Sequence, residues 1–174
     1  MKTIVYLTGY PGCGKSTVGK KLAKGLNYKF YDLDKEIEKK AGMSVNGIFE
    51  KYGEEKFREM ESEVLTELSK AKNAVIATGG GTPCYNNNPE IIESTGLSVY
   101  LKMPPAALAV RLINAKTKRP LLKNISKDKL INHIEEQLKE REIFYNKADL
   151  IVDAQNTEIV SLMTLIKKYQ KNNF

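Results

Sequence analysis

The chain has 174 residues, of which 41% are apolar and 28% are charged, and its formal net charge is +7. At roughly 100–200 residues per domain, this length predicts a single domain spanning 1–174 with its own hydrophobic core. The composition argues against a disordered, collagen-like or coiled-coil protein, because those classes have far more biased amino-acid usage.

Short apolar runs alternate with helical segments along the chain. The runs are rich in β-branched and aromatic residues and are predicted to be buried strands: Thr3–Leu7, Lys29–Tyr31, Ala74–Ala77, Ser98–Leu101 and Leu150–Val152. The segments between them are predicted to be helices: Lys15–Gly25, Val45–Tyr52, Glu54–Ala71, Pro89–Glu93, Pro105–Ile113, Lys127–Tyr145 and Glu158–Tyr169. This alternation is typical of a three-layer α/β/α fold with a five-stranded parallel sheet.

Two stretches depart from the simple alternation, and we expect both to be mobile flaps over a site. Lys35–Gly53 is polar and helical where one crossover helix would suffice. Asn114–Ile125 is basic, has no periodic apolar stripe and contains Arg119 followed by Pro120.

We find no sequence pattern of a membrane span, a signal peptide or a disulfide framework. No apolar stretch approaches the about 18 residues of a membrane span, and the first strand runs into a glycine loop too early for a signal peptide. Cys13 and Cys84 fit no metal-ligand spacing and are too few for a disulfide framework. We therefore expect a cytoplasmic protein that does not bind membranes.

The turn after the first strand fits the P-loop pattern, because it reads Gly9-Tyr10-Pro11-Gly12-Cys13-Gly14-Lys15-Ser16. Glycines let successive backbone N–H groups turn towards a phosphate, and the following helix adds its positive amino end. Lys15 would reach the β- and γ-phosphates, and the Ser16 hydroxyl would bind Mg²⁺. The alternative is a glycine-rich turn that binds nothing. The predicted ATP-binding residues here are Gly12, Cys13, Gly14, Lys15, Ser16 and Thr17.

Asp32 and Asp34 are predicted to end the second strand on either side of Leu33. The carboxyl ends of parallel strands face the ligand crevice, so both carboxylates should point towards the phosphates. One could hold the metal, and the other could accept a hydrogen bond from an incoming hydroxyl. The alternative is that either aspartate caps the helix that begins near Lys35.

Three successive glycines, Gly79, Gly80 and Gly81, follow the third strand. They cost backbone entropy and supply no packing, so they indicate a close approach of the backbone to another group. Their position at a strand's carboxyl end favours a ligand, and the alternative is a flexible turn.

The positive charge is concentrated in one segment. Residues 101–129 contain eight Lys or Arg and one acid, whereas the rest of the chain has 20 basic and 20 acidic residues. Only four basic residues are Arg, whose planar fork suits carboxylates and phosphates: Arg58, Arg111, Arg119 and Arg141. Arg58 is three residues from Glu61 on a predicted helix, which alone would indicate a surface ion pair.

In combination, these residues resemble the shikimate kinases, a family of P-loop kinases. The resemblance runs nearly end to end and places a substrate-binding insert at about 33–61 and a lid at about 112–125. Its motifs come in the family's order: Gly9–Thr17, Asp32–Asp34, Phe49–Glu61, Gly79–Gly81, Arg119–Leu122, and Arg141 with Tyr145 and Asp149.

The resemblance implies transfer of the γ-phosphoryl group of ATP to the 3-hydroxyl of shikimate. Asp34 would contact that hydroxyl, Arg58 and Arg141 would hold the carboxylate, and Gly79–Gly81 would present backbone N–H groups to the ring hydroxyls. Arg119 would close from the lid onto the ATP phosphates. Mg²⁺ would be held by Ser16 and Asp32. The implied catalytic residues are Lys15, Asp34 and Arg119.

Two alternatives remain open at this point. The first is a related kinase acting on gluconate or a nucleoside monophosphate, although a nucleotide acceptor would not explain two Arg aimed at a carboxylate. The second is a basic nucleotide-binding protein that acts on nucleic acid. Residues 101–129 contain no aromatic residue on which a base could stack, so we expect no nucleic acid partner. No heptad run or long apolar patch is apparent, so we expect a monomer.

Overall fold

The computed structural model describes residues 3–115 and 126–173. Its strands are β1 (Ile4–Thr8), β2 (Lys29–Asp32), β3 (Ala74–Ala77), β4 (Leu97–Lys102) and β5 (Leu150–Asp153). Its α-helices are α1 (Lys15–Leu26), α2 (Leu33–Ala41), α3 (Val45–Leu68), α4 (Asn88–Thr95), α5 (Pro105–Ile113), α6 (Lys127–Tyr145) and α7 (Ile159–Asn173). A short 3-10 helix, η1 (Thr82–Cys84), follows the triple glycine.

The strands form one sheet in the order β2-β3-β1-β4-β5, with every pair parallel. β1 is central: Leu7 lies beside Ala77 of β3 on one side and Val99 of β4 on the other. The predicted five-stranded parallel sheet is therefore confirmed. Because all strands run the same way, the segments that follow β1, β2 and β3 all begin at the carboxyl end of the sheet.

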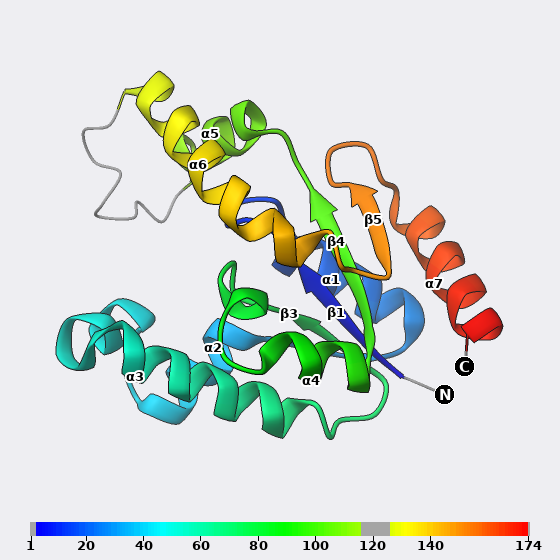
Figure 1. Ribbon diagram of the computed structural model, residues 1–174. Coiled ribbons are helices and arrows are strands. Elements are labelled where there is room, and N and C mark those ends of the chain that lie inside the picture. Colours follow the sequence, from blue (N-terminus) through cyan, green and yellow to red (C-terminus); the bar gives the residue numbers. More distant parts are fainter. Residues whose placement is uncertain (1–2, 116–125, 174) are drawn as a thin grey trace.

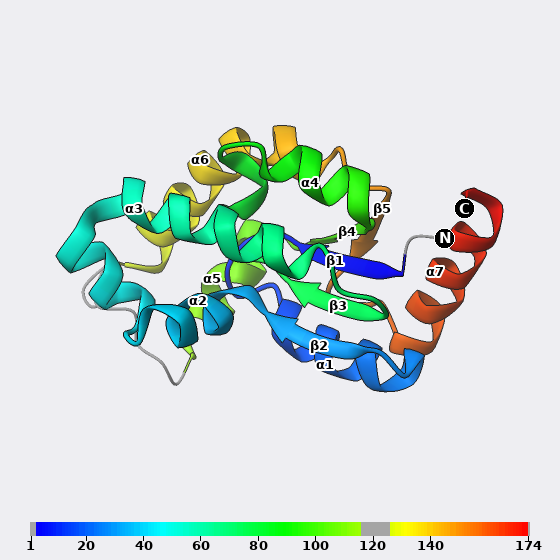
Figure 2. The ribbon, with the colours of Figure 1, turned by 90° about the horizontal axis from the view of Figure 1, so that it is seen from below.

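Helices cover both faces of the sheet (Figures 1 and 2). Figure 2 shows α3 and α4 on one side and α1 on the other. The hydrophobic core has two parts, one on each face of the sheet. Side chains along β1 point alternately to the two faces, so Tyr6 belongs to the part formed with α2, α3 and α4, and Leu7 belongs to the part formed with α1, α5, α6 and α7. No helix in the described part of the chain is long and apolar enough to cross a membrane.

The predicted helices Val45–Tyr52 and Glu54–Ala71 together make up α3, and the break between them is confirmed at Gly53, whose backbone is not helical and whose φ of 81° lies in the left-handed region. The predicted strand end at Asp34 is wrong, because β2 stops at Asp32 and Asp34 lies in the first turn of α2. Leu33, the first residue of α2, is fully buried in the core.

Candidate active site

The loop after β1 wraps the amino end of α1 in the way the P-loop pattern predicts. Gly9, Gly12 and Gly14 have φ values of 137°, 90° and 102°, which other residues rarely adopt, so the glycines are needed for this path. Gly14 occupies the N-cap of α1, and the first helical residue is Lys15. The Lys15 Nζ donates to the carbonyl oxygens of Gly9 at 2.7 Å and Tyr10 at 3.2 Å. The lysine is thus held across the loop.

Ser16 and Asp32 are brought together from α1 and β2. The Ser16 hydroxyl donates to the Asp32 carboxylate at 2.6 Å. Asp32 stands at the N-cap position of α2, but its side chain makes no capping hydrogen bond, so the capping alternative does not hold for it. Its carboxylate faces the P-loop helix instead.

The Ser16 and Asp32 pair has the chemistry that Mg²⁺ requires. A hydroxyl and a carboxylate are hard oxygen ligands, and Mg²⁺ usually takes one or two of them together with substrate phosphates and water. Among the described residues no group of three or more His, Cys, Asp or Glu is placed to hold a metal. Ser16 and Asp32 would leave the other positions around an Mg²⁺ ion to phosphate and water oxygens.

A cavity of about 250 Å³ joins the P-loop to the ends of β2 and β3. Its polar lining suits a charged ligand. The lining residues are Pro11, Gly12, Gly14, Lys15, Ser16, Thr17, Asp32, Asp34, Thr78, Gly79 and Gly80. Most of the predicted ATP-binding residues, both aspartates and two of the three glycines thus share one space. Cys13 is buried beneath the loop.

Asp34 approaches the triple glycine from α2. A Cβ atom built on Gly79 would lie 3.1 Å from Asp34 Oδ1 and 3.0 Å from Glu61 Oε1. A side chain at this position would therefore crowd two carboxylates. Asp34 and Lys15 line the same cavity, so a hydroxyl near Asp34 can face a phosphate on the P-loop.

Gly80 and Gly81 allow two arginines to approach the backbone. A Cβ on Gly81 would lie 2.7 Å from Arg58 Nη2, and one on Gly80 would lie 3.4 Å from Arg141 Nη1 and 2.5 Å from Pro11 Cδ. The Tyr145 hydroxyl donates to the Gly80 carbonyl oxygen, which fixes the peptide from the side of α6. Close packing thus explains the glycines, and a flexible turn does not.

The Arg58 and Glu61 pair is buried, so it is not the surface ion pair that its spacing alone indicates. The side chains are 13% and 1% exposed, and Arg58 Nη1 donates to Glu61 Oε2 at 2.8 Å. Glu61 Oε1 also accepts a hydrogen bond from Thr82 at 2.6 Å. Burial disfavours the charged guanidinium, but Glu61 and Glu54 outweigh it and raise the pKa of Arg58 above its ordinary value. Arg58 therefore stays charged at a desolvated position.

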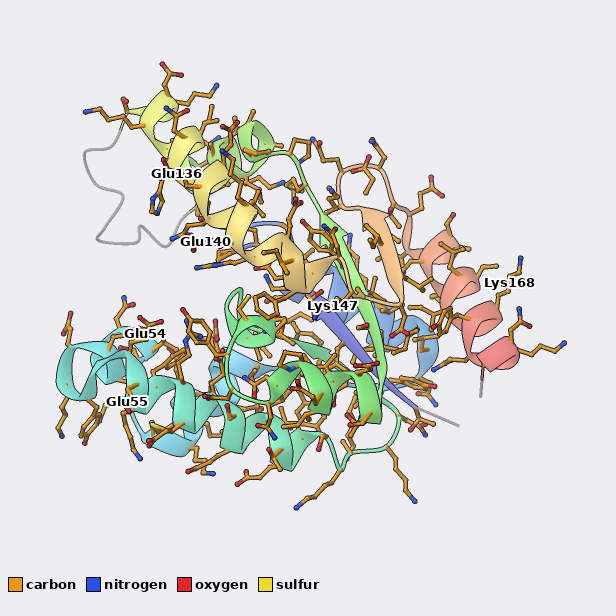
Figure 3. All side chains as sticks on the ribbon, in the orientation of Figure 1. Glu54, Glu55, Glu136, Glu140, Lys147 and Lys168 are labelled. Atoms are coloured by element: carbon orange, nitrogen blue, oxygen red, sulfur yellow. The ribbon has the colours of Figure 1, made fainter. Side chains whose placement is uncertain are left out.

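Arg141 and Arg111 contact the P-loop from α6 and α5. The Arg141 Cζ lies 5.4 Å from the centre of the Tyr10 ring, and Arg111 Nη1 donates to the Cys13 carbonyl at 3.2 Å. Figure 3 labels Glu54 on α3 and Glu140 on α6, the helices that also carry Arg58 and Arg141. The site is thus assembled from helices on both sides of the P-loop. The predicted lid residue Arg119 lies outside the described residues.

Several contacts around the arginines were not found by reading the sequence. Tyr85 lies against Arg58 with 3.9 Å between Cζ and the ring centre, and Tyr10 donates to Gln137 on α6 at 2.7 Å. The scarcity of Arg draws attention to all four arginines, and the family resemblance selects Arg58 and Arg141, but neither signal indicates the rings beside them. Such rings come from distant segments and follow no spacing.

Comparisons with known proteins agree with this geometry. A family model described as shikimate kinase matches residues 11–170. The shikimate kinase of Parabacteroides distasonis is 44% identical over 151 residues, which cover 87% of each chain. A crystal structure of shikimate kinase from Bacteroides thetaiotaomicron has a TM-score of 0.90 and 38% identity and covers 97% of this chain and 98% of that one.

A second solved structure, shikimate kinase from Acinetobacter baumannii in complex with shikimate, has a TM-score of 0.83 and 35% identity. The match covers 98% of this chain and 94% of the other. The fold, the P-loop geometry and these matches lead to one assignment. The chain belongs to the shikimate kinase family.

Proposed function

We propose that this protein phosphorylates the 3-hydroxyl of shikimate with ATP, giving shikimate 3-phosphate and ADP, a step of chorismate and aromatic amino-acid biosynthesis. One observation carries the proposal: two arginines, Arg58 and Arg141, and the carboxylate of Asp34 converge on Gly79–Gly81, beside the P-loop. A substrate with one carboxylate and several hydroxyls matches these groups. The proposal agrees with the family.

On this proposal the P-loop binds the ATP phosphates. The backbone N–H groups of Gly12, Cys13 and Gly14 and those of Ser16 and Thr17 face the phosphate oxygens, and Lys15 turns from its carbonyl partners to the γ-phosphate. When bound by Ser16 and Asp32, Mg²⁺ would neutralise charge on the phosphate oxygens. Arg119 would add a further positive charge from the lid.

The acceptor is held on the other side of the cavity. Arg58 and Arg141 bind the shikimate carboxylate, and the Gly79–Gly81 backbone orients the ring hydroxyls. Asp34 accepts the proton of the shikimate 3-hydroxyl. The hydroxyl oxygen forms a bond to the γ-phosphorus of ATP, and the bond between the γ-phosphorus and the oxygen that bridges to the β-phosphate breaks and leaves ADP. Phosphoryl transfer depends on positioning and charge neutralisation, and the acceptor groups would supply the first while the P-loop and Mg²⁺ would supply most of the second.

The finer organisation belongs to the same proposal. Residues 1–174 would form one kinase domain, with an acceptor-binding insert at about 33–61 and a lid at about 112–125, most of which lies outside the described residues. We propose a cytoplasmic monomer without a nucleic acid partner. The basic excess of residues 101–129 would then serve ATP through the lid rather than a polyanion.

A coupled assay of ADP formation tests the proposal. Purified protein with Mg²⁺ and ATP is offered shikimate, gluconate or nucleoside monophosphates in separate reactions. We expect ADP to form with shikimate only, at a rate that depends on Mg²⁺. Equal background rates with every acceptor would overturn the proposal, and turnover of gluconate or a nucleotide alone would reassign the acceptor.

A further inference from the structure

The segment 82–88, which follows the triple glycine, is fastened to α3 by side-chain hydrogen bonds. Asn86 Nδ2 donates to the Arg58 carbonyl at 3.2 Å and to Ser62 Oγ at 2.9 Å. Asn88 is buried and donates to the Thr82 carbonyl at 3.0 Å. Asn86 has a φ of 52°, in the left-handed region that Asn tolerates better than most residues. The path of this segment is therefore set by its own amides.

This path brings the ring of Tyr85 against Arg58. The Cζ of Arg58 lies 3.9 Å from the ring centre, within the range of a cation–π contact, whereas the Phe57 ring is 5.1 Å away. The ring uses none of the guanidinium N–H donors. Tyr85 thus holds Arg58 without occupying the groups that a ligand needs.

The edges of the guanidinium are held differently. The carboxylate of Glu61, which is buried, accepts a hydrogen bond from Arg58 Nη1. The carboxylate of Glu54, whose side chain is 54% exposed, accepts from Nε at 3.3 Å and from Nη2 at 3.1 Å. An incoming carboxylate can replace the exposed Glu54 more easily than the buried Glu61. During that exchange Tyr85 and Glu61 keep the guanidinium in place.

We propose that Tyr85 is a positioning residue: its ring holds the Arg58 guanidinium in the plane in which it receives the acceptor carboxylate. The inference rests on the proposed function, since it takes Arg58 as a carboxylate-binding residue. Arginine loses rotamer freedom when it binds a ligand, so an arginine that is already stacked binds more tightly. Tyr85 acts through Arg58 and therefore affects acceptor binding rather than phosphoryl transfer.

Kinetics of Tyr85 variants test the inference in the full-length protein. We expect Tyr85→Ala to raise the KM for shikimate by about three- to tenfold, which corresponds to the rotamer freedom that an arginine without its stacking ring would lose on binding the carboxylate. The KM for ATP and kcat should stay within about twofold. Tyr85→Phe keeps the ring and should behave as the wild type. Val160→Ala, which removes an exposed apolar side chain on α7, is the control for a general surface change.

A double-mutant cycle separates positioning from a structural role. Arg58→Lys removes the planar group on which Tyr85 acts, so adding Tyr85→Ala to it should raise the KM for shikimate by less than about twofold. An equal rise in both backgrounds would show that Tyr85 acts elsewhere. Thermal melting of each variant checks that the fold is kept.

The outcomes distinguish this inference from the function on which it rests. A wild-type protein that does not phosphorylate shikimate overturns both. An active wild type whose Tyr85→Ala variant has an unchanged KM for shikimate, or loses ATP and shikimate affinity equally, overturns the inference alone. Loss of affinity in Tyr85→Phe as large as in Tyr85→Ala would also overturn it, because the ring would then not be the cause.

Discussion

The two sides of the cavity are built in different ways. On the proposed function, the nucleotide side is one continuous segment of eight neighbouring residues, Gly9–Ser16, that follows the central strand and contains Lys15. The acceptor side would be formed by side chains from α2, α3 and α6 around the backbone of Gly79–Gly81. A backbone site depends on loop conformation, whereas a side-chain site depends on the packing of separate elements. Substitutions should therefore affect the two sides differently.

The largest expected effect concerns Asp34, which stands between the two sides. Asp34→Asn removes the proposed proton acceptor and should lower kcat by about 10²–10⁴, while the affinity for an ATP analogue changes by less than about twofold. Steady-state assays and equilibrium binding measure the two quantities. Asp128→Asn is a matched control, because Asp128 also lies in the first turn of a helix but is exposed on α6. Retained turnover in Asp34→Asn would remove this residue from the chemistry.

The next largest effects are expected from substitutions of the arginines, which should affect the binding of one substrate more than that of the other. Arg58→Lys and Arg141→Lys lose the planar fork and should each raise the KM for shikimate by about ten- to a hundredfold, with the KM for ATP changed by less than about threefold. Arg111→Lys is the contrasting variant, since Arg111 contacts the Cys13 carbonyl in the P-loop and should affect ATP more. Steady-state titration of each substrate decides the comparison. Equal effects on both substrates would contradict a division into two sides.

Alanine substitutions of the neighbouring glycines Gly80 and Gly81 should have smaller effects that differ from each other. The methyl group of Gly80→Ala would meet the Pro11 ring at 2.5 Å, which is part of the P-loop and cannot easily move. Such overpacking should lower the melting temperature by about 2–12 °C and weaken the binding of both ATP and shikimate. The methyl group of Gly81→Ala would meet the Arg58 guanidinium at 2.7 Å and push it away from Glu61, so some stability should be lost here too, but only shikimate binding should weaken. The reverse pattern would overturn this reading of the packing.

The smallest expected consequence for catalysis concerns Cys84, whose reactivity reports the electrostatics beside Arg58 and Arg141. Burial raises the pKa of its thiol to about 11, although Arg141 and Arg58 favour the thiolate. At pH 8 the thiolate fraction falls about a hundredfold below that of an unperturbed cysteine, and alkylation should slow accordingly. The rate should rise about tenfold for each pH unit up to pH 10. Peptide mapping after iodoacetamide treatment measures it, and modification as fast as that of a small thiol would contradict the burial.

How much of the site follows from sequence depends on how local each part is. The P-loop is contiguous, so its motif predicts both the path of the loop and the place of Lys15. The five strands follow from their apolar runs. The sequence pattern predicts Asp34 at a strand end, whereas it lies in a helix, because three residues are too few for periodicity to separate the end of a strand from the first turn of a helix.

The acceptor side could not be read from spacing alone. Arg58 and Glu61 have the spacing of a surface pair, and only the packing of α3 against η1 buries them. The place of Tyr85 depends on the amides of Asn86 and Asn88, whose partners lie up to 28 residues away. The family resemblance indicates Arg58 and Arg141 because it summarises such long-range contacts. The resemblance assigns no role to Tyr85, which lies outside the motifs that carry it.

The position of each strand in the sheet also affects how readily the site opens. β1 is fully buried between two partners, whereas β2 lies at the sheet edge with one partner and is partly exposed. Edge elements unfold locally more often than central ones, so amide hydrogens of β1 should exchange with deuterium far more slowly than those of β2. Ser16 follows the central strand and Asp32 ends the edge strand. Brief opening of this edge would therefore separate the two side chains that would hold Mg²⁺, while the loop after β1 keeps its shape.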